Sequence, residues 1–128
     1  MDIPRSVADE LTYNVIGAAI EVHRIMGPGL LESIYQSCMI EELQLRKIDF
    51  QSQYRIPLIY KGVPLKEEFV IDIFFPGLLV LELKAVEKIL PIHEAQLLSY
   101  LKLTGIKLGL IMNFHHPILR DGIKRMML

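Results

Sequence analysis

The chain has almost no cysteine, because Cys38 stands alone among 128 residues. One thiol cannot form a disulfide within the chain, so a disulfide-stapled domain is excluded and a reducing compartment is expected. No apolar segment reaches the roughly 20 residues that a membrane-spanning helix needs, since Asp72, Glu82 and Lys84 interrupt the most apolar stretch. The opening MDIPRSVADE contains no apolar signal-peptide segment. We therefore expect a cytoplasmic protein with no membrane association.

The chain also lacks a strong excess of either charge. Its 14 basic and 15 acidic residues give a formal net charge of −1, so nothing draws the whole molecule toward a polyanion. Residues 1–49 carry eight acids and four bases, whereas residues 50–128 carry seven acids and ten bases. The mildly basic second half permits a nucleic-acid partner without requiring one, and ordinary surface composition produces the same asymmetry.

Repeats, low-complexity tracts and linkers are absent, and 52% of the residues are hydrophobic. These features indicate one packed domain over residues 1–128. Helical periodicity covers residues 6–27, with Ser6 as cap, and a second helix runs from about 29 to 47. The expected buried stripes are Val7, Leu11, Val15, Ala18, Val22 and Ile25 on the first helix, and Leu31, Ile34, Cys38 and Leu45 on the second.

Beyond Phe50 the hydrophobic period becomes that of strands. We expect strands over 54–60, 67–75, 78–86 and 107–114, and a helix from Pro91 to about Leu103. The tail, 118–128, fits either a short strand or a helix. The middle strands are apolar on both faces, which predicts an α/β fold whose central mixed sheet is flanked by helices on both sides.

Two acids in neighbouring strands raise the question of register. A two-residue turn would put Asp72 and Glu82 on opposite faces of the hairpin. A three-residue loop pairs Phe75 with Leu79 and sets the two acids directly opposite each other. Gly77 can adopt the left-handed conformation that such loops use, so we favour the three-residue loop or a bulge of equal effect.

Opposed carboxylates repel each other and lose hydration, and a hard divalent cation between them removes both costs. Asp72 and Glu82 are therefore candidate ligands of Mg²⁺ or Mn²⁺. Lys84 shares the face of Glu82 and could steady negative charge that develops on a phosphate. Asp…Glu-x-Lys on a hairpin thus fits phosphodiester hydrolysis. The competing interpretation is an ordinary ion pair at a sheet end.

The same residues resemble a known family. Asp72 with Glu82-Leu83-Lys84 is similar to the PD-(D/E)xK nuclease superfamily, although Ile71 stands where the proline of that name would be. The stretch GLLESIY resembles the signature of the GxxExxY proteins, and the likeness extends over residues 7–128. The resemblance implies a restriction-endonuclease-like αβββαβ core with an extra N-terminal helix.

The resemblance also implies residue roles. Asp72 and Glu82 would hold the metal, Lys84 would be the catalytic lysine, and Glu32 would add an acid from the leading helical region. Gln96 and Tyr100 match the QxxxY element of RecB-type nucleases. The supporting and substrate-contacting set is then Gln96, Tyr100, Tyr35 and His93.

Spacing alone supports part of this assignment. Gln96 and Tyr100 lie four apart, and His93 lies three before Gln96, so all three share one helix face. They could contact a phosphate or form a polar stripe at a sheet end. Glu32 could equally be a first-turn acid that the helix dipole favours. Tyr35 is expected to orient Glu32 or to pack beneath the site.

Three functions remain open on the sequence. The first is a Mg²⁺- or Mn²⁺-dependent nuclease acting on nucleic acid, DNA rather than RNA, with a homodimer as one way to cut both strands. The second is a catalytically inactive nuclease fold that binds nucleic acid or a protein partner. The third is a structural or small-molecule-binding protein. The first is favoured because four catalytic-type residues are present together, and buried charges without a function are costly. These residues are Glu32, Asp72, Glu82 and Lys84.

Overall fold

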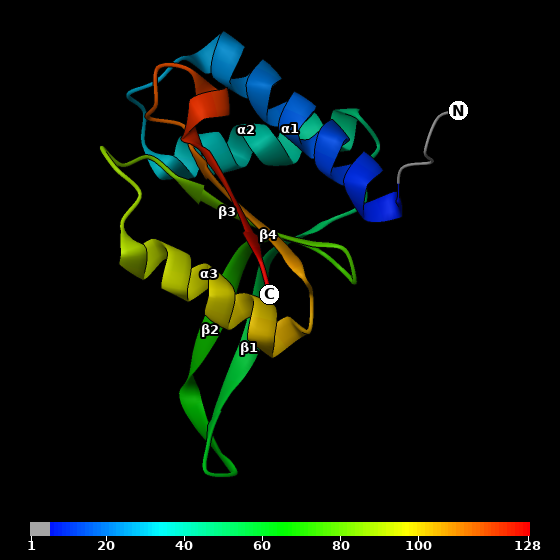
Figure 1. The fold of residues 1–128 in the computed structure, drawn as a ribbon, viewed down its shortest axis with the longest axis vertical. Helices are drawn as coiled ribbons and strands as arrows, with labels where there is room; N and C mark the ends of the chain where they lie inside the picture. Colours follow the sequence, from blue (N-terminus) through cyan, green and yellow to red (C-terminus); the bar gives the residue numbers. More distant parts are fainter. Residues whose placement is uncertain (1–5) are drawn as a thin grey trace.

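The fold was analysed in a computed structural model that describes residues 6–128 (Figure 1). Five strands form one mixed sheet in the order β1-β2-β3-β4-β5, in which only the β3–β4 pair is parallel. The predicted α/β architecture is confirmed. The elements are α1 (Val7–Met26), α2 (Glu32–Leu45), β1 (Gln51–Tyr60), β2 (Val63–Phe75), β3 (Leu79–Lys84), α3 (Pro91–Thr104), β4 (Leu108–Asn113), the short 3₁₀ helix η1 (Leu119–Gly122) and β5 (Ile123–Met127).

Helix α1 begins and ends where the sequence predicts. The Ser6 hydroxyl accepts a hydrogen bond from the Asp9 N–H at 3.1 Å, and Gly27 ends the helix with a φ of 72°. Val15, Ala18 and Val22 of the predicted stripe are buried. The two ends of that stripe are wrong, because Val7 and Ile25 extend beyond the core and are exposed.

The buried face of α2 differs from the predicted one. Tyr35, Met39 and Leu43 are fully buried, whereas Leu31, Ile34 and Leu45 are exposed and Cys38 is partly buried. Apolar side chains occur almost all round this helix, so periodicity did not select a face. The contacts of the other core elements select it instead.

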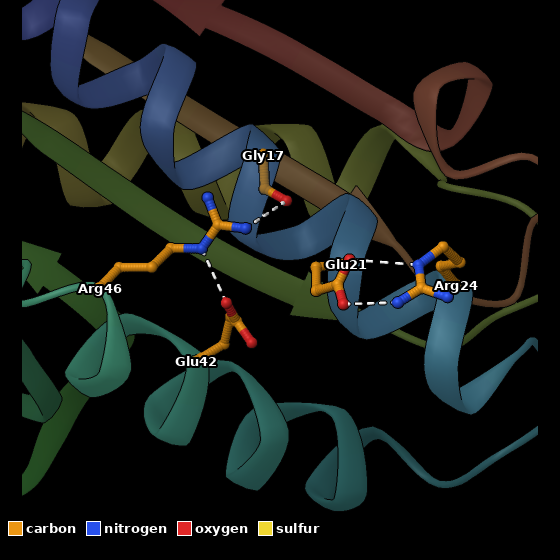
Figure 2. A network of polar contacts seen from close by, with 5 residues as sticks. All are labelled: Gly17, Glu21, Arg24, Glu42 and Arg46. Carbon is orange, nitrogen blue, oxygen red and sulfur yellow. Dashed lines mark hydrogen bonds and ion pairs between the residues drawn. The ribbon is translucent and has the colours of Figure 1, made fainter.

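Helices α1 and α2 are joined by a polar network at their surface (Figure 2). The Arg46 guanidinium donates to Glu42 at 2.7 Å and to the Gly17 carbonyl of α1 at 3.4 Å. Glu21 and Arg24 form a second ion pair on α1 at 2.6 Å. Only the bond from Arg46 to the Gly17 carbonyl links the two helices, and exposed ion pairs such as these contribute less than about 1 kcal/mol each.

The sheet is covered on both faces, as predicted. Helices α1 and α2 lie on one face and α3 on the other (Figure 1). The first face packs Val15, Tyr35 and Met39 against β-strand residues such as Leu81 and Leu110. The second packs Leu97 and Leu101 against the opposite side of the same strands. Apolar runs on both sides of β3 and β4 are therefore explained by two cores.

The loop between β2 and β3 has the predicted three-residue register. Phe75 pairs with Leu79, and Ile73 pairs with Leu81. The Leu78 N–H donates to the Phe75 carbonyl at 2.9 Å, and Gly77 has a φ of 76°. Pro followed by a glycine of positive φ is the combination typical of a type II turn. Continuing this register by one residue sets Asp72 opposite Glu82.

The C-terminal half completes the sheet. Pro91 opens α3 and Gly105 closes it in a left-handed conformation, as predicted. The tail, for which the sequence allowed a short strand or a helix, contains one of each. The 3₁₀ helix η1 is followed by strand β5, which pairs with β4. Within residues 6–128, no helix combines the length and apolar character needed to cross a lipid bilayer.

Candidate active site

The centre of the site lies where β2 and β3 stop pairing. The last ladder pair is Ile73 with Leu81, and beyond it two side chains take over the hydrogen bonding. The Asp72 N–H donates to Oε1 of Glu82 at 3.1 Å, and the Leu83 N–H donates to Oδ2 of Asp72 at 2.9 Å. Each acid therefore satisfies a backbone N–H at the point where the ladder ends. This reciprocal arrangement holds the two carboxyl groups side by side.

Burial dominates the electrostatics of this pair. Glu82 is only 5% exposed, and burial followed by the charge of Asp72 raises its pKa to about 8. Burial also raises the pKa of Asp72, against the hydrogen bond from the Leu83 N–H and the charge of Lys84. The raised pKa values favour a proton on the pair near neutral pH, and a bound cation would displace that proton.

Lys84 is the basic residue whose charge acts on both Asp72 and Glu82. It ends β3, and its charge favours the ionised forms of both Asp72 and Glu82. The same charge lowers the pKa of Glu32, although burial raises that pKa overall. The charges of Lys84, Asp72 and Glu82 therefore act on one another, and the catalytic roles predicted for these three residues stay predictions. Glu32, at the start of α2, joins the field of the site through Lys84 and Asp72.

Tyr100 and Gln96 of α3 approach the same carboxylates. The Gln96 amide donates to the Tyr100 hydroxyl at 3.1 Å. Burial raises the pKa of Tyr100, and the charges of Glu82 and Asp72 raise it further. The Tyr100 side chain therefore lies within the electrostatic field of the acid pair, and Gln96, which donates to its hydroxyl, is exposed. This arrangement fits the predicted supporting roles, which stay predictions.

His93 lies on the same helix but has a local partner. Its Nδ1 accepts a hydrogen bond from the Leu90 N–H at 3.0 Å, which caps the start of α3. A neutral ring that accepts at Nδ1 carries its proton on Nε2, so His93 can still donate outward. A substrate contact through that atom stays a prediction.

Tyr35 supports the site from a distance. It is fully buried, and its ring stacks on Phe114 with centroids 4.7 Å apart. Its hydroxyl donates to the Gly27 carbonyl at 2.5 Å and accepts from the Leu30 N–H at 3.1 Å. Tyr35 therefore fixes the connection that leads into α2 and Glu32. Its hydroxyl holds backbone groups of that connection, and a role in orienting Glu32 or packing beneath the site stays a prediction.

Sequence reasoning missed Asn113. This residue is the parallel partner of Lys84 and is only 4% exposed. Its amide donates to the Val86 carbonyl at 2.8 Å, and its side-chain oxygen accepts from the Val86 N–H at 3.1 Å. Asn113 thereby clamps the chain directly after Lys84. A polar residue ending the apolar strand LGLIMN was the available signal, but its partner lies 27 residues away.

The donor set fits a hard divalent cation bound through two carboxylates. Among residues 6–128, no three His, Cys, Asp or Glu side chains are grouped closely enough to form a cage by themselves. Mg²⁺ does not require such a cage, because it commonly uses one or two carboxylates, several waters and the phosphates of a substrate. A buried pair of acids that backbone N–H groups hold in place meets that requirement.

Comparison with known proteins gives one finding. A family model described as the PD-(D/E)XK nuclease superfamily matches residues 9–126. Neither the comparison with curated proteins nor the comparison with solved structures gives a match.

Proposed function

The chain belongs to the PD-(D/E)XK nuclease superfamily, and from that premise we propose that it hydrolyses phosphodiester bonds of nucleic acid with Mg²⁺ or Mn²⁺. Membership indicates a nuclease-type function. The metal, the residue roles and the preference for DNA are the proposed part. The finer likeness to the GxxExxY proteins and a homodimeric state remain predictions.

The observation that carries the proposal is the reciprocal pairing of Asp72 and Glu82. Two buried acids side by side are costly unless something compensates them. Their backbone hydrogen bonds fix the two carboxyl groups, and only Lys84 offsets their charge in the described surroundings. A divalent cation held by both carboxylates would compensate the remaining negative charge.

Asp72 and Glu82 would hold the cation, which when bound would polarise a phosphoryl oxygen and lower the pKa of an attacking water. The protein residues then supply position and charge. Lys84 places a positive charge beside the acids, where it can offset negative charge that develops on the phosphate. Glu32 feels the same positive charge and would hold the Lys84 ammonium between the two acidic sides of the site.

The remaining residues act on position. Asn113 fixes the end of β3 and thereby the starting point of the Lys84 side chain. Gln96 and Tyr100 present an amide and a hydroxyl at the edge of the site, where they can donate to substrate phosphates. Such contacts order the substrate without taking part in bond cleavage.

The test uses purified protein with labelled single- and double-stranded DNA and RNA, in Mn²⁺ or in EDTA. We expect Mn²⁺-dependent cutting that Asp72→Asn and Lys84→Ala each lower by at least about 100-fold. Lys102→Ala, which changes an exposed lysine on α3, is the matched control and should cut normally. Thermal melts establish that each variant is folded. Binding of nucleic acid without cutting in every form would contradict the proposal and identify a binding module.

A further inference from the structure

The hairpin of β1 and β2 projects far beyond the rest of the sheet (Figure 1). Every residue from 59 to 68 is exposed, and we call this segment the outer hairpin. Its tip is a two-residue turn in which Lys61 and Gly62 have φ values of 50° and 79°. Such turns match the twist of the flanking strands, so the ribbon is well formed up to its end.

Basic residues lie toward the tip of this ribbon. Residues 50–66 contain the three bases Arg55, Lys61 and Lys66 and no acid, whereas the whole chain has a net charge of −1. The outer hairpin also contains Glu67 and Glu68, so its formal charges balance, and its two bases lie nearer the tip than its two acids. Exposed apolar side chains accompany these bases, namely Ile59, Tyr60, Val63 and Leu65. The Lys61 ammonium lies 5.6 Å from the centre of the Tyr60 ring.

The base of the hairpin is fixed to the candidate active site. The ring of Tyr54 stacks on Phe74 with centroids 4.2 Å apart. The ring of Phe69, which lies on the same strand as Asp72, meets the ring of Tyr100 edge-on with centroids 6.3 Å apart. The ribbon therefore leaves the site in a set direction.

We propose that the outer hairpin is an arm that contacts the flank of a duplex nucleic acid whose cleaved phosphate lies at the Asp72–Glu82 site. The inference rests on the proposed nuclease function and adds the substrate class to it. Lys61 and Lys66 contact phosphates, and the two-stranded ribbon has the width that a major groove admits.

The length of the arm agrees with this role. Ten residues separate Asp72 from Gly62, and at about 3.3 Å per residue they span at most about 33 Å. One turn of duplex DNA is about 34 Å long. In a complex where the arm runs along the duplex axis, its tip would contact the duplex about one helical turn from the cleaved bond, on the same side of the double helix.

A second copy of the chain is a poorer occupant. Pro57 lies in the edge strand β1 and cannot donate to an added strand, and the register between Pro57 and Ile59 shifts at a bulge. Both features oppose strand-to-strand pairing of two copies. The lysines at the tip would also repel each other in a symmetric contact.

The test measures binding to DNA duplexes of about 12 and about 30 base pairs in EDTA, so that cutting is not required. The arm variant is Lys61→Asn with Lys66→Gln, because Asn-Gly is a favoured sequence for this turn and preserves it. The matched control is Lys47→Asn with Lys107→Gln. Lys47 also has a positive φ, at 57°, and both control lysines are exposed outside the hairpin.

We expect the wild type and the control to bind the longer duplex more tightly than the shorter one. The arm variant should lose most of this difference in affinity between the two duplexes. Two phosphate contacts contribute about 1.8 to the salt slope, so between about 50 and about 200 mM salt the wild type should lose roughly 12-fold more affinity than the arm variant. Equal salt slopes and equal length dependence in all three proteins would overturn the inference alone. The inference would also be overturned if the arm variant changed its oligomeric state while its affinity for the duplex stayed the same. Failure of every form to bind nucleic acid would overturn the proposed function as well.

Discussion

Replacing Glu82 by Gln should stabilise the metal-free protein at neutral and alkaline pH. The amide is neutral and keeps an oxygen that can accept the Asp72 N–H, so the local hydrogen bonding is preserved. It removes the cost of a buried acid beside a second acid. A substitution at the centre of the site is therefore expected to stabilise the fold while it abolishes the proposed cation binding.

The magnitude follows from the pKa of Glu82, which burial and the charge of Asp72 raise from 4.5 to about 8. The folded protein binds more protons than the unfolded chain within this window, so its free energy of unfolding falls as pH rises from 4.5 to 8. Each pKa unit corresponds to about 1.4 kcal/mol, which gives an upper figure of about 4 kcal/mol at pH 7.5. Structural relaxation and water entry reduce desolvation costs, so we expect the variant to gain about 2 kcal/mol.

The assay is urea unfolding in EDTA at several pH values, with Glu87→Gln as the control because Glu87 is exposed in the loop after β3. The stability difference between wild type and Glu82→Gln should be near zero at about pH 4 and grow toward pH 8. The control should show no such growth. A variant that is destabilised at pH 7.5, or a difference that does not change with pH, would refute the argument that burial raises the pKa of Glu82.

Three further predictions concern the same region. Tyr35→Phe should lower the free energy of unfolding by about 1–3 kcal/mol, measured in urea, because two backbone groups lose their partner; an unchanged stability would contradict this. Asn113→Ala should lower the free energy of unfolding by about 2–4 kcal/mol in urea and also slow cutting, because Val86, just after Lys84, loses both hydrogen bonds to Asn113. Full nuclease activity in a destabilised variant would limit Asn113 to a structural role. Mn²⁺ affinity, measured by calorimetry, should rise up to about tenfold per pH unit below pH 8 as the Glu82 proton is displaced, and a flat profile would argue against that ligand.

Much of the site was accessible from sequence because it depends on local geometry. Gly77 after Pro76 predicts the loop conformation, and the loop length fixes the register that sets Asp72 opposite Glu82. Alternation along β3 then places Lys84 on the face of Glu82. Three short-range rules were enough to bring these residues together.

The missed features depend on long-range contacts. Asn113 acts on Val86 through the parallel β3–β4 pair, and no local pattern reports such a partner. The buried face of α2 was misassigned because apolar residues surround that helix, and tertiary packing of Tyr35 decided its rotation. The dual character of the tail likewise depends on β5 pairing with β4.

The most direct test of the central claim is a crystal of the protein soaked in Mn²⁺ and measured at the manganese absorption edge. The account predicts an anomalous peak between the carboxylates of Asp72 and Glu82, with the Lys84 side chain directed toward the same space. A peak at another site, or none there at saturating Mn²⁺, would contradict it.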